Sequence, residues 1–216
     1  RDVKVPNPGV PYRVPQDLDI EGTEGTPASL TLEPGTVFQM GEGAGINCGY
    51  SQNAAFRAVG TADKPIVFAR LPDMPKGSAW KGLQFFSHCR PPVLEHVKLA
   101  HGPRGGALVH HRDSKGLGSM RHCTLARSDG HGVLVTGTKE RFESFDENTF
   151  EDLAESAVAM PAEYAHLLGE HNVFPAGTTI ELDGDVRRDT TLSGLAVAYV
   201  LKSGGKIETV DAAKSA

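Results

Sequence analysis

Arginine, aspartate and histidine side chains that could carry out acid–base chemistry occur in two neighbouring parts of the sequence. Arg127, Asp129 and His131 are separated by single residues, and Asp152 follows in a second acidic segment. Carboxylates can hold Ca²⁺, and arginine or histidine can remove the proton beside the carboxyl group of a uronate. These four residues are the candidate catalytic site of a polysaccharide lyase or epimerase. Arg127 and Asp152 would serve equally well as an ion pair.

A second group of residues has the donor atoms of a transition-metal site. His88, His110 and His111 are expected to lie on neighbouring repeats of the chain, with the Cys89 thiolate and the Asp113 carboxylate nearby. Imidazole, thiolate and carboxylate groups suit zinc and related ions. Their spacing is not the compact H-x-x-x-H type, so exposed histidines in bends are the alternative interpretation.

A third set consists of His96, His122 and His171, which recur on the expected outer side of the repeats, with Glu147 in the equivalent place of one repeat. A stacked imidazole surface could bind a metal ion or respond to pH. The alternative is that these side chains simply form the polar outer face of a sheet. Ca²⁺ and a transition metal are the two cofactors that the sequence suggests.

The elements that would position these groups repeat along the chain. The frame Leu94-x-x-Val97-x-Leu99 returns as Met120-x-x-Cys123-x-Leu125, as Phe145-x-x-Asn148-x-Phe150 and, more loosely, as Gly169-x-x-Asn172-x-Phe174. The last members are 26, 25 and 24 residues apart (99 to 125, 125 to 150, 150 to 174). A second series aligns Leu83/Phe85, Ala107/Val109, Val133/Val135 and Ala157/Ala159. A near-constant period of this length is the signature of a repeat architecture.

The period predicts short strands that stack in parallel, one coil upon the next. Like residues recur one whole repeat later, so each strand is expected to pair with its equivalent on the adjacent coil, about 4.8 Å away. Stacking then buries like residues on like, as in other solenoids. Asn148 would lie inside the stack above Asn172, where side-chain amides can hydrogen-bond along a ladder.

A single domain is expected over residues 1–216. The predicted division is an extended N-terminal arm (1–15), coils (16–184), a terminal coil or cap (185–210) and a tail (211–216). The arm is predicted because its four prolines lack N–H donors. The cap is predicted because the open end of a solenoid exposes a sheet edge.

Composition excludes several function classes. The formal charge is −5, from 22 basic and 27 acidic residues that are intermingled, which gives no electrostatic surface for nucleic acid. No apolar run approaches the roughly 20 residues of a transmembrane helix. The 3 cysteines give no disulfide framework. Cys48 and Cys123 are expected in the core, and Cys89 is expected in an accessible loop.

Three segments together resemble bacterial right-handed parallel β-helix repeat proteins. They are Leu30–Val37 with its Pro34-Gly35 turn, Gly60–Phe68 with Gly-Thr followed by Pro-Ile-Val-Phe, and Trp80–Phe85 with Trp-Lys-Gly. In that family, segments of these three kinds precede the regular coils in this order. The resemblance covers about residues 11–184. It implies an all-β, right-handed single-stranded parallel β-helix with short terminal caps, similar in fold to pectate lyases.

The resemblance also implies an exported or cell-surface protein, although the chain begins at Arg1 without a signal-peptide segment. Many members of that family have no demonstrated catalysis, and some bind or modify polysaccharides. We therefore expect a non-catalytic scaffold whose partner is a polysaccharide or a protein surface. A polysaccharide lyase or epimerase acting on acidic glycans is the alternative.

Overall fold

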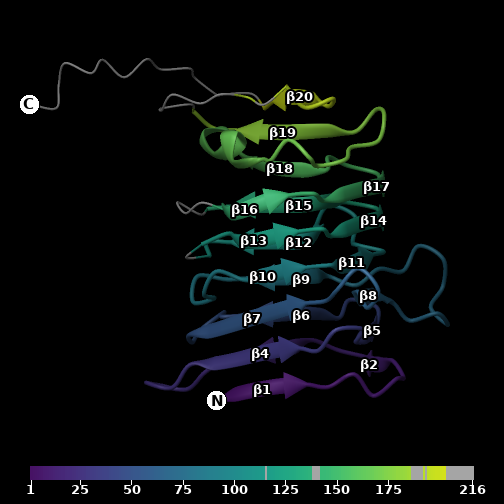
Figure 1. Ribbon diagram of the computed structural model, residues 1–216, viewed down its shortest axis with the longest axis vertical. Coiled ribbons are helices and arrows are strands. Elements are labelled where there is room, and N and C mark those ends of the chain that lie inside the picture. The colour runs from purple at the N-terminus through teal and green to yellow at the C-terminus, as the bar shows by residue number, and fades with distance from the viewer. Residues whose placement is uncertain (115, 138–141, 186–191, 193, 203–216) are drawn as a thin grey trace, which may run out of the picture.

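The computed structural model describes residues 1–114, 116–137, 142–185, 192 and 194–202. These residues form a right-handed parallel β-solenoid of about 7 turns, whose coils stack along the long axis of the molecule (Figure 1). Among them, the sole helical element is a short 3₁₀ segment, η1 (Ala162–Leu167). The predicted all-β solenoid is confirmed.

Successive coils contribute one strand each to three parallel sheets. Sheet A contains β1 (Asp2–Val5), β4 (Ala28–Leu32), β7 (Ala54–Val59), β10 (Val93–Glu95), β13 (Gly118–Arg121) and β16 (Phe142–Asp146). Sheet B contains β2 (Tyr12–Val14), β5 (Val37–Met40), β8 (Ile66–Arg70), β11 (Val97–Ala100), β14 (Thr124–Ser128) and β17 (Thr149–Leu153). Sheet C contains β3 (Leu18–Ile20), β6 (Gly45–Cys48), β9 (Gly82–Phe85), β12 (Ala107–Arg112), β15 (His131–Thr136), β18 (Val158–Pro161), β19 (Thr179–Asp183) and β20 (Ala198–Leu201).

The predicted inward columns of sheets A and B are confirmed. Leu94 pairs with Met120, which pairs with Phe145, and Leu99, Leu125 and Phe150 are in register on sheet B. The column continues to Phe174, whose ring stacks on Phe150 with 5.1 Å between the centroids. Residues about 25 positions apart therefore lie directly over one another inside one continuous core.

The N-terminal coils fill the same interior with aromatic rings. Tyr12, Phe38 and Phe68 stack in sequence on sheet B, with centroids 5.5 and 5.0 Å apart. Trp80 closes the row at 6.0 Å from Phe68, and its indole N–H donates to the Ala100 carbonyl at 2.7 Å. That hydrogen bond allows the indole to be fully buried without an unsatisfied donor.

The predicted N-terminal arm is instead the first coil. Asp2–Val5 pairs along its whole length with β4, and Tyr12–Val14 pairs with β5. The prolines lie outside β1, β2 and β3, where no ladder N–H is required. At the other end, β20 of the predicted terminal coil pairs with β19, while the predicted tail, 211–216, lies outside the described residues.

The register predicted for sheet C differs from the structure. Leu83 pairs with Val109 and Phe85 pairs with His111, a step of 26 residues (83 to 109) where the sequence pattern suggested 24. Val133 pairs with Val158, where Ala157 was expected. The shift by two residues keeps the same side of β12 inward, but it places His111 in the inward column.

Two corners of the solenoid are made by residues in the left-handed backbone region. His96, His122 and Glu147 turn the chain from sheet A to sheet B, with φ of 49°, 52° and 59°. His101, Arg127 and Asp152 have φ of 68°, 51° and 49° at the C-terminal end of sheet B. Histidine and aspartate are enriched in this conformation. The recurring histidines at the first corner therefore fit a backbone requirement.

One loop leaves the stack. Leu71–Ala79 lies between β8 and β9 and projects from the side of the solenoid (Figure 1). The chain rejoins the stack at Trp80, and β9 pairs with β6 without a break in register.

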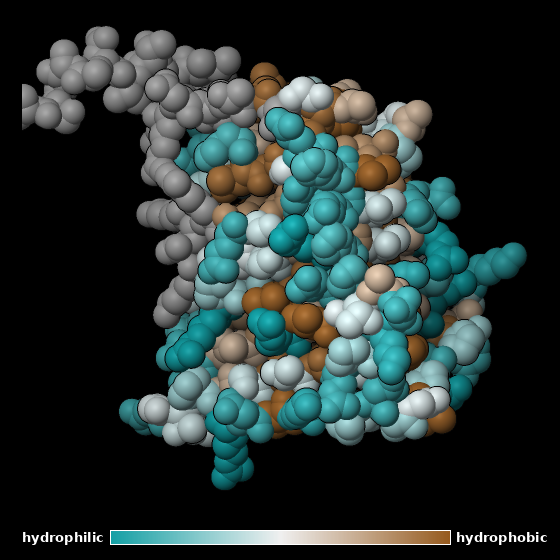
Figure 2. Space-filling view, in the orientation of Figure 1, coloured by the Kyte–Doolittle hydropathy of each residue, from teal (hydrophilic) through white to brown (hydrophobic). Residues whose placement is uncertain are grey.

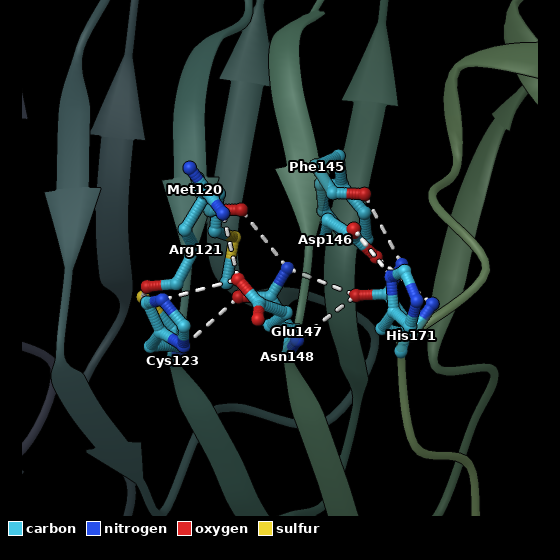
Figure 3. A network of polar contacts seen from close by, with 10 residues as sticks. Met120, Arg121, Cys123, Phe145, Asp146, Glu147, Asn148 and His171 are labelled. Atoms are coloured by element: carbon cyan, nitrogen blue, oxygen red, sulfur yellow. Dashed lines mark hydrogen bonds and ion pairs between the residues drawn. The ribbon is translucent and has the colours of Figure 1, made fainter.

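The predicted asparagine ladder is the main polar feature of the core (Figure 3). Asn148 is fully buried; its side chain accepts from the Cys123 backbone N–H and donates to the Met120 carbonyl, each at 3.0 Å. Its Nδ2 also donates to Asn172 Oδ1 at 3.0 Å, and Asn172 donates to the Phe145 carbonyl at 3.1 Å. The two amides thus join three successive coils.

We expect Asn148→Ala to lower the free energy of unfolding by about 3 kcal/mol, because it leaves a buried backbone donor and acceptor without partners. Urea unfolding with an unchanged m-value would measure the loss. Asn47→Ala is the matched control, since Asn47 donates to Asp19 at an exposed position and should cost less than about 1 kcal/mol. Equal losses for the two variants would contradict the structural role of the ladder.

Candidate functional site

A row of hollows follows the outer face of sheet C. Two hollows of about 380 and 460 Å³ lie on the N-terminal coils, and two of about 590 and 670 Å³ lie side by side on the C-terminal coils. The first two share Asn47 and Phe86, and the last two share His131, Glu181 and Lys202. We call this row the sheet C face. It runs parallel to the solenoid axis.

One outward column forms the floor of the sheet C face. Strand pairing fixes its members, because each occupies the equivalent position on its own coil. They are Asp19, Asn47, Gln84, His110, Leu134, Ala159, Glu181 and Val200. The N-terminal half of the column is polar, so this part of the sheet offers hydrogen-bonding groups at each coil.

An exposed aromatic pair lies at the N-terminal end of the sheet C face. Tyr50 is 69 % exposed and meets Phe86 edge-on, with 5.1 Å between the ring centroids. The Glu21 carboxylate accepts from the backbone N–H groups of Tyr50 and Gln52 at 2.6 and 2.7 Å, which fixes the turn that carries the tyrosine. The Arg112 guanidinium carbon lies 5.7 Å from the centre of the Phe86 ring.

His131 occupies the C-terminal part of the sheet C face. Its Nε2 lies 2.8 Å from Glu155 Oε2, and its Nδ1 lies 2.7 Å from Ser156 Oγ. A carboxylate only accepts, so Nε2 donates to Glu155 and, in the neutral ring, Nδ1 accepts from the Ser156 hydroxyl. Both ring nitrogens are therefore engaged. Ser156 itself is buried, with 1 % exposure.

The four residues of the predicted catalytic site are distributed over two faces. Arg127 and Asp152 are in register, between the pairs Ala126–Glu151 and Ser128–Leu153, and both line a separate hollow of about 490 Å³ on sheet B.

His131 lies on the sheet C face, and Asp152 lines hollows on both sheets. Asp129 lines neither of these hollows; its backbone N–H donates to the Gly102 carbonyl at 3.3 Å. The structure thus brings Arg127 next to Asp152 and Asp152 near the His131 groove, but it does not gather the four side chains.

The three residues of the predicted metal site are also separated. His110 and His111 are consecutive in β12, so their side chains point to opposite faces. His111 packs in the core against Phe85 and Phe142, at 5.2 and 5.8 Å between centroids. His110 points outward, with Nε2 3.2 Å from Thr136 Oγ1. His88 lies in the turn after β9, with Nδ1 3.2 Å from Ser87 Oγ.

Burial governs the acid–base behaviour of this pair. Desolvation, with a smaller effect of His110, lowers the pKa of His111 from 6.5 to about 3. Desolvation also lowers the pKa of His110 to about 4, with Arg112 and His131 adding repulsion. Both imidazoles are therefore neutral over most of the pH range in which the folded protein would be studied.

Sequence reasoning did not include the aromatic pair, Glu21 or Ser156 in a site. Glu155 was noted in the acidic segment but not assigned a role. Tyr50 and Phe86 follow β6 and β9, and the sequence pattern did not predict the pairing of these two strands. In β3, β6 and β9, the polar residues Asp19, Asn47 and Gln84 alternate with apolar ones, and this alternation was the sequence signal for an outward-facing column.

Acid should destabilise the fold through His111. Its pKa in the folded state is below its value of 6.5 in the unfolded chain, so the unfolded chain binds a proton first as the pH falls. Stability is then full above about pH 6.5 and decreases toward pH 3. We expect His111→Leu to remove about 1.4 kcal/mol per pH unit from the slope of unfolding free energy between these limits.

Phe85→Leu is the control for this measurement, because it changes the same core column without removing a titratable group. It should lower stability at every pH and keep the slope of the original chain. A slope that is unchanged in His111→Leu would contradict the buried neutral state of His111. Chemical denaturation at a series of pH values measures both.

Among the described residues, no helix has the length and apolar character that a bilayer span would require. Comparison of the chain with known protein families, with curated proteins and with solved structures found no match.

Proposed function

We propose that this protein is a non-catalytic scaffold of the cell surface or of the exterior that binds a glycan along the sheet C face. The observation that carries the proposal is the row of hollows along the solenoid axis, whose lining combines polar and apolar groups. A linear polymer is the ligand whose shape fits such a row. The coils present equivalent positions about every 4.8 Å, a spacing comparable with the length of one sugar unit.

The chemistry of the lining supports a glycan. Sugar hydroxyl groups both donate and accept, and the outward column presents the Asp19 carboxylate and the Asn47 amide on two successive coils. The exposed Tyr50 ring provides a flat apolar surface beside them. Ligand sites in proteins commonly combine aromatic walls with a few placed polar groups.

A protein partner is less well supported by the surface. The apolar core typical of a large protein interface would require a contiguous hydrophobic patch. Hydrophilic and hydrophobic side chains are interspersed on the face shown in Figure 2. The exposed large hydrophobic residues are divided between the first coils (Val3, Val10 and Tyr50), the segment after η1 (Val173) and the C-terminal end (Leu192, Val200 and Leu201).

The engagement of His131 supports a binding role without catalysis. The one acceptor nitrogen of His131 is directed at the hydroxyl of Ser156, which is 1 % exposed, so the proton within its reach belongs to a buried group and not to a ligand in the groove. Arg127 belongs to the hollow on sheet B. The alternative of a uronate lyase or epimerase is supported by one feature, the position of Asp152 between the two hollows.

The exported setting, the bacterial source and kinship with pectate-lyase-like proteins are parts of the same proposal. They are supported by the Leu30–Val37, Gly60–Phe68 and Trp80–Phe85 segments together with the parallel solenoid. A fold of this kind is used for unrelated functions, so the glycan itself has to be identified by binding.

Binding to soluble polysaccharides tests the proposal. The purified chain would be titrated calorimetrically with neutral glucans and xylans and with polygalacturonate and alginate. We expect at least one to bind, and Tyr50→Ala to weaken binding about tenfold, which corresponds to about 1.4 kcal/mol. Tyr50→Phe should retain most of the affinity because it keeps the ring.

Val173→Ala is the control, since Val173 is exposed but does not line the sheet C face. Equal affinities for the original chain and Tyr50→Ala, or an equal loss in Val173→Ala, would contradict the assigned face. Absence of binding across the panel would contradict a glycan ligand. Formation of an unsaturated product that is lost in Arg127→Ala would instead establish the lyase alternative.

A further inference from the structure

Two histidines on adjacent coils lie face to face at the corner between sheets A and B. His96 follows β10 and His122 follows β13, and each has the left-handed backbone that turns its coil from sheet A to sheet B. Their rings are parallel within 5°, with 4.6 Å between the centroids. Both side chains are partly exposed, so their ring nitrogens can be reached from solvent.

We propose that His96, His122 and Glu95 bind a divalent transition-metal ion of the zinc type. One ligand atom from each of the three side chains lies within 4.8 Å of the others. Zinc is held by imidazole nitrogen and carboxylate oxygen at about 2.0–2.2 Å, often with three protein ligands and a water molecule. The lone pair of an imidazole nitrogen lies in the ring plane, so the two parallel rings have to tilt toward each other to share one ion, a rotation for which partly exposed side chains are suited.

The ligand set selects the class of ion. Two imidazoles favour zinc, copper or nickel over Ca²⁺ and Mg²⁺, which prefer oxygen ligands. Three ligands come from two different coils, so the backbone pairing of Glu95 with Arg121 holds them in place before an ion binds. A preformed arrangement of this kind reduces the cost of ordering the ligands.

The surrounding charges are compatible with a cation. Glu147 Oε2 lies 3.1 Å from His122 Nε2, and Arg121 Nη2 donates to the same oxygen at 2.7 Å (Figure 3). A carboxylate on one imidazole nitrogen orients the ring when a metal takes the other nitrogen. Glu95 and Glu147 together outweigh the single charge of Arg121.

The site is confined to two coils. On the N-terminal side, Gly60 occupies the corner and donates its N–H to the Glu95 carbonyl at 2.8 Å. On the C-terminal side, His171 is engaged by Asp146, with 2.9 Å between Nδ1 and Oδ2. This hydrogen bond raises the pKa of His171, which disfavours the neutral ring that a metal requires. One ion per chain is therefore expected.

Metal titration tests the site. The untagged full chain, treated with a chelator and dialysed, would be titrated with Zn²⁺ by calorimetry at neutral pH. We expect one ion per chain and no displacement by excess Ca²⁺. His96→Asn and His122→Asn should each weaken binding about tenfold or more, and asparagine keeps the left-handed backbone so that the corner still folds.

His171→Asn is the matched control, because this exposed histidine belongs to the same outer column but lies outside the ligand set. It should bind Zn²⁺ like the original chain. Thermal unfolding gives a second readout: Zn²⁺ should raise the unfolding midpoint of the original chain and of His171→Asn, but not of the other two variants. Unchanged affinity in His96→Asn and His122→Asn, or an equal loss in His171→Asn, would overturn the proposal.

A separate observation concerns two of the cysteines. Cys48 ends β6, and Cys89 follows β9 in a turn that lies against it; the sulfur atoms are 2.9 Å apart. Both residues are fully buried, which corrects the accessible loop expected for Cys89. The Phe86 N–H donates to the Cys48 carbonyl at 2.9 Å, so backbone pairing holds the turn in place. A Cβ on Gly49 would approach the Cys89 nitrogen to 2.1 Å, so this contact requires glycine.

We infer that Cys48 and Cys89 form a disulfide when the chain folds in the presence of a small-molecule disulfide such as oxidised glutathione. The two thiols lose two protons and two electrons, and the small disulfide is reduced to two thiols. Because both sulfurs are buried in the folded chain, the exchange takes place before the turn closes. Cys123 is left as a thiol, buried in the core with its Sγ 3.2 Å from the Arg121 carbonyl.

Counting thiols tests the cross-link. The chain would be refolded with oxidised glutathione, unfolded in the presence of an alkylating agent and analysed by mass spectrometry. We expect one alkylated residue, Cys123, and 3 after reduction. The Cys123→Ser control should show none before reduction. Three alkylated residues without reduction, or a cross-link that includes Cys123, would overturn the inference.

Discussion

Each coil of this protein finds backbone hydrogen-bond partners on the coils next to it. The parallel pairing of sheets A, B and C places every strand against its equivalents one repeat before and after. A side chain that points inward therefore meets the inward side chain of the same position on the adjacent coil. This constraint explains why the core contains columns such as Leu99, Leu125 and Phe150. It also explains how Asn148 can be buried, because the adjacent coils supply a partner for each of its polar atoms.

The sequence predicted the architecture where the repeats are regular. From β10 to β17 the short strands of sheets A and B are separated by only one or two residues, so the frame Leu94-x-x-Val97-x-Leu99 contains both strands and returns at nearly constant intervals. The bends that lead into the strands of sheet C differ in length from coil to coil. Because inward and outward residues alternate with a period of two, the pattern cannot distinguish a repeat of 24 residues from a repeat of 26 residues. For the same reason His111 was expected in a loop, whereas pairing with Phe85 places it in the core.

The candidate sites were harder to predict, because they depend on which outward residues of different coils become neighbours. Arg127 and Asp152 were correctly placed in register, yet Arg127 lines the hollow on sheet B, away from His131, while Asp152 lines hollows on both sheets. The histidines of the first corner carry two signals at once. The left-handed backbone alone explains why histidine occurs at this corner. The stacking of His96 on His122 follows from the pairing of their coils, which only the structure reveals.

The Leu71–Ala79 loop shows how such a molecule can gain new parts. It departs from one corner and returns to the next strand, and the pairing of β6 with β9 is maintained across it. Residues inserted at this corner would project from the stack into solvent. Their number and sequence would therefore not have to follow the repeat pattern of the core. The solenoid can thus acquire appended binding loops or whole modules at its corners by lengthening them, one coil at a time, while its stacked body stays the same.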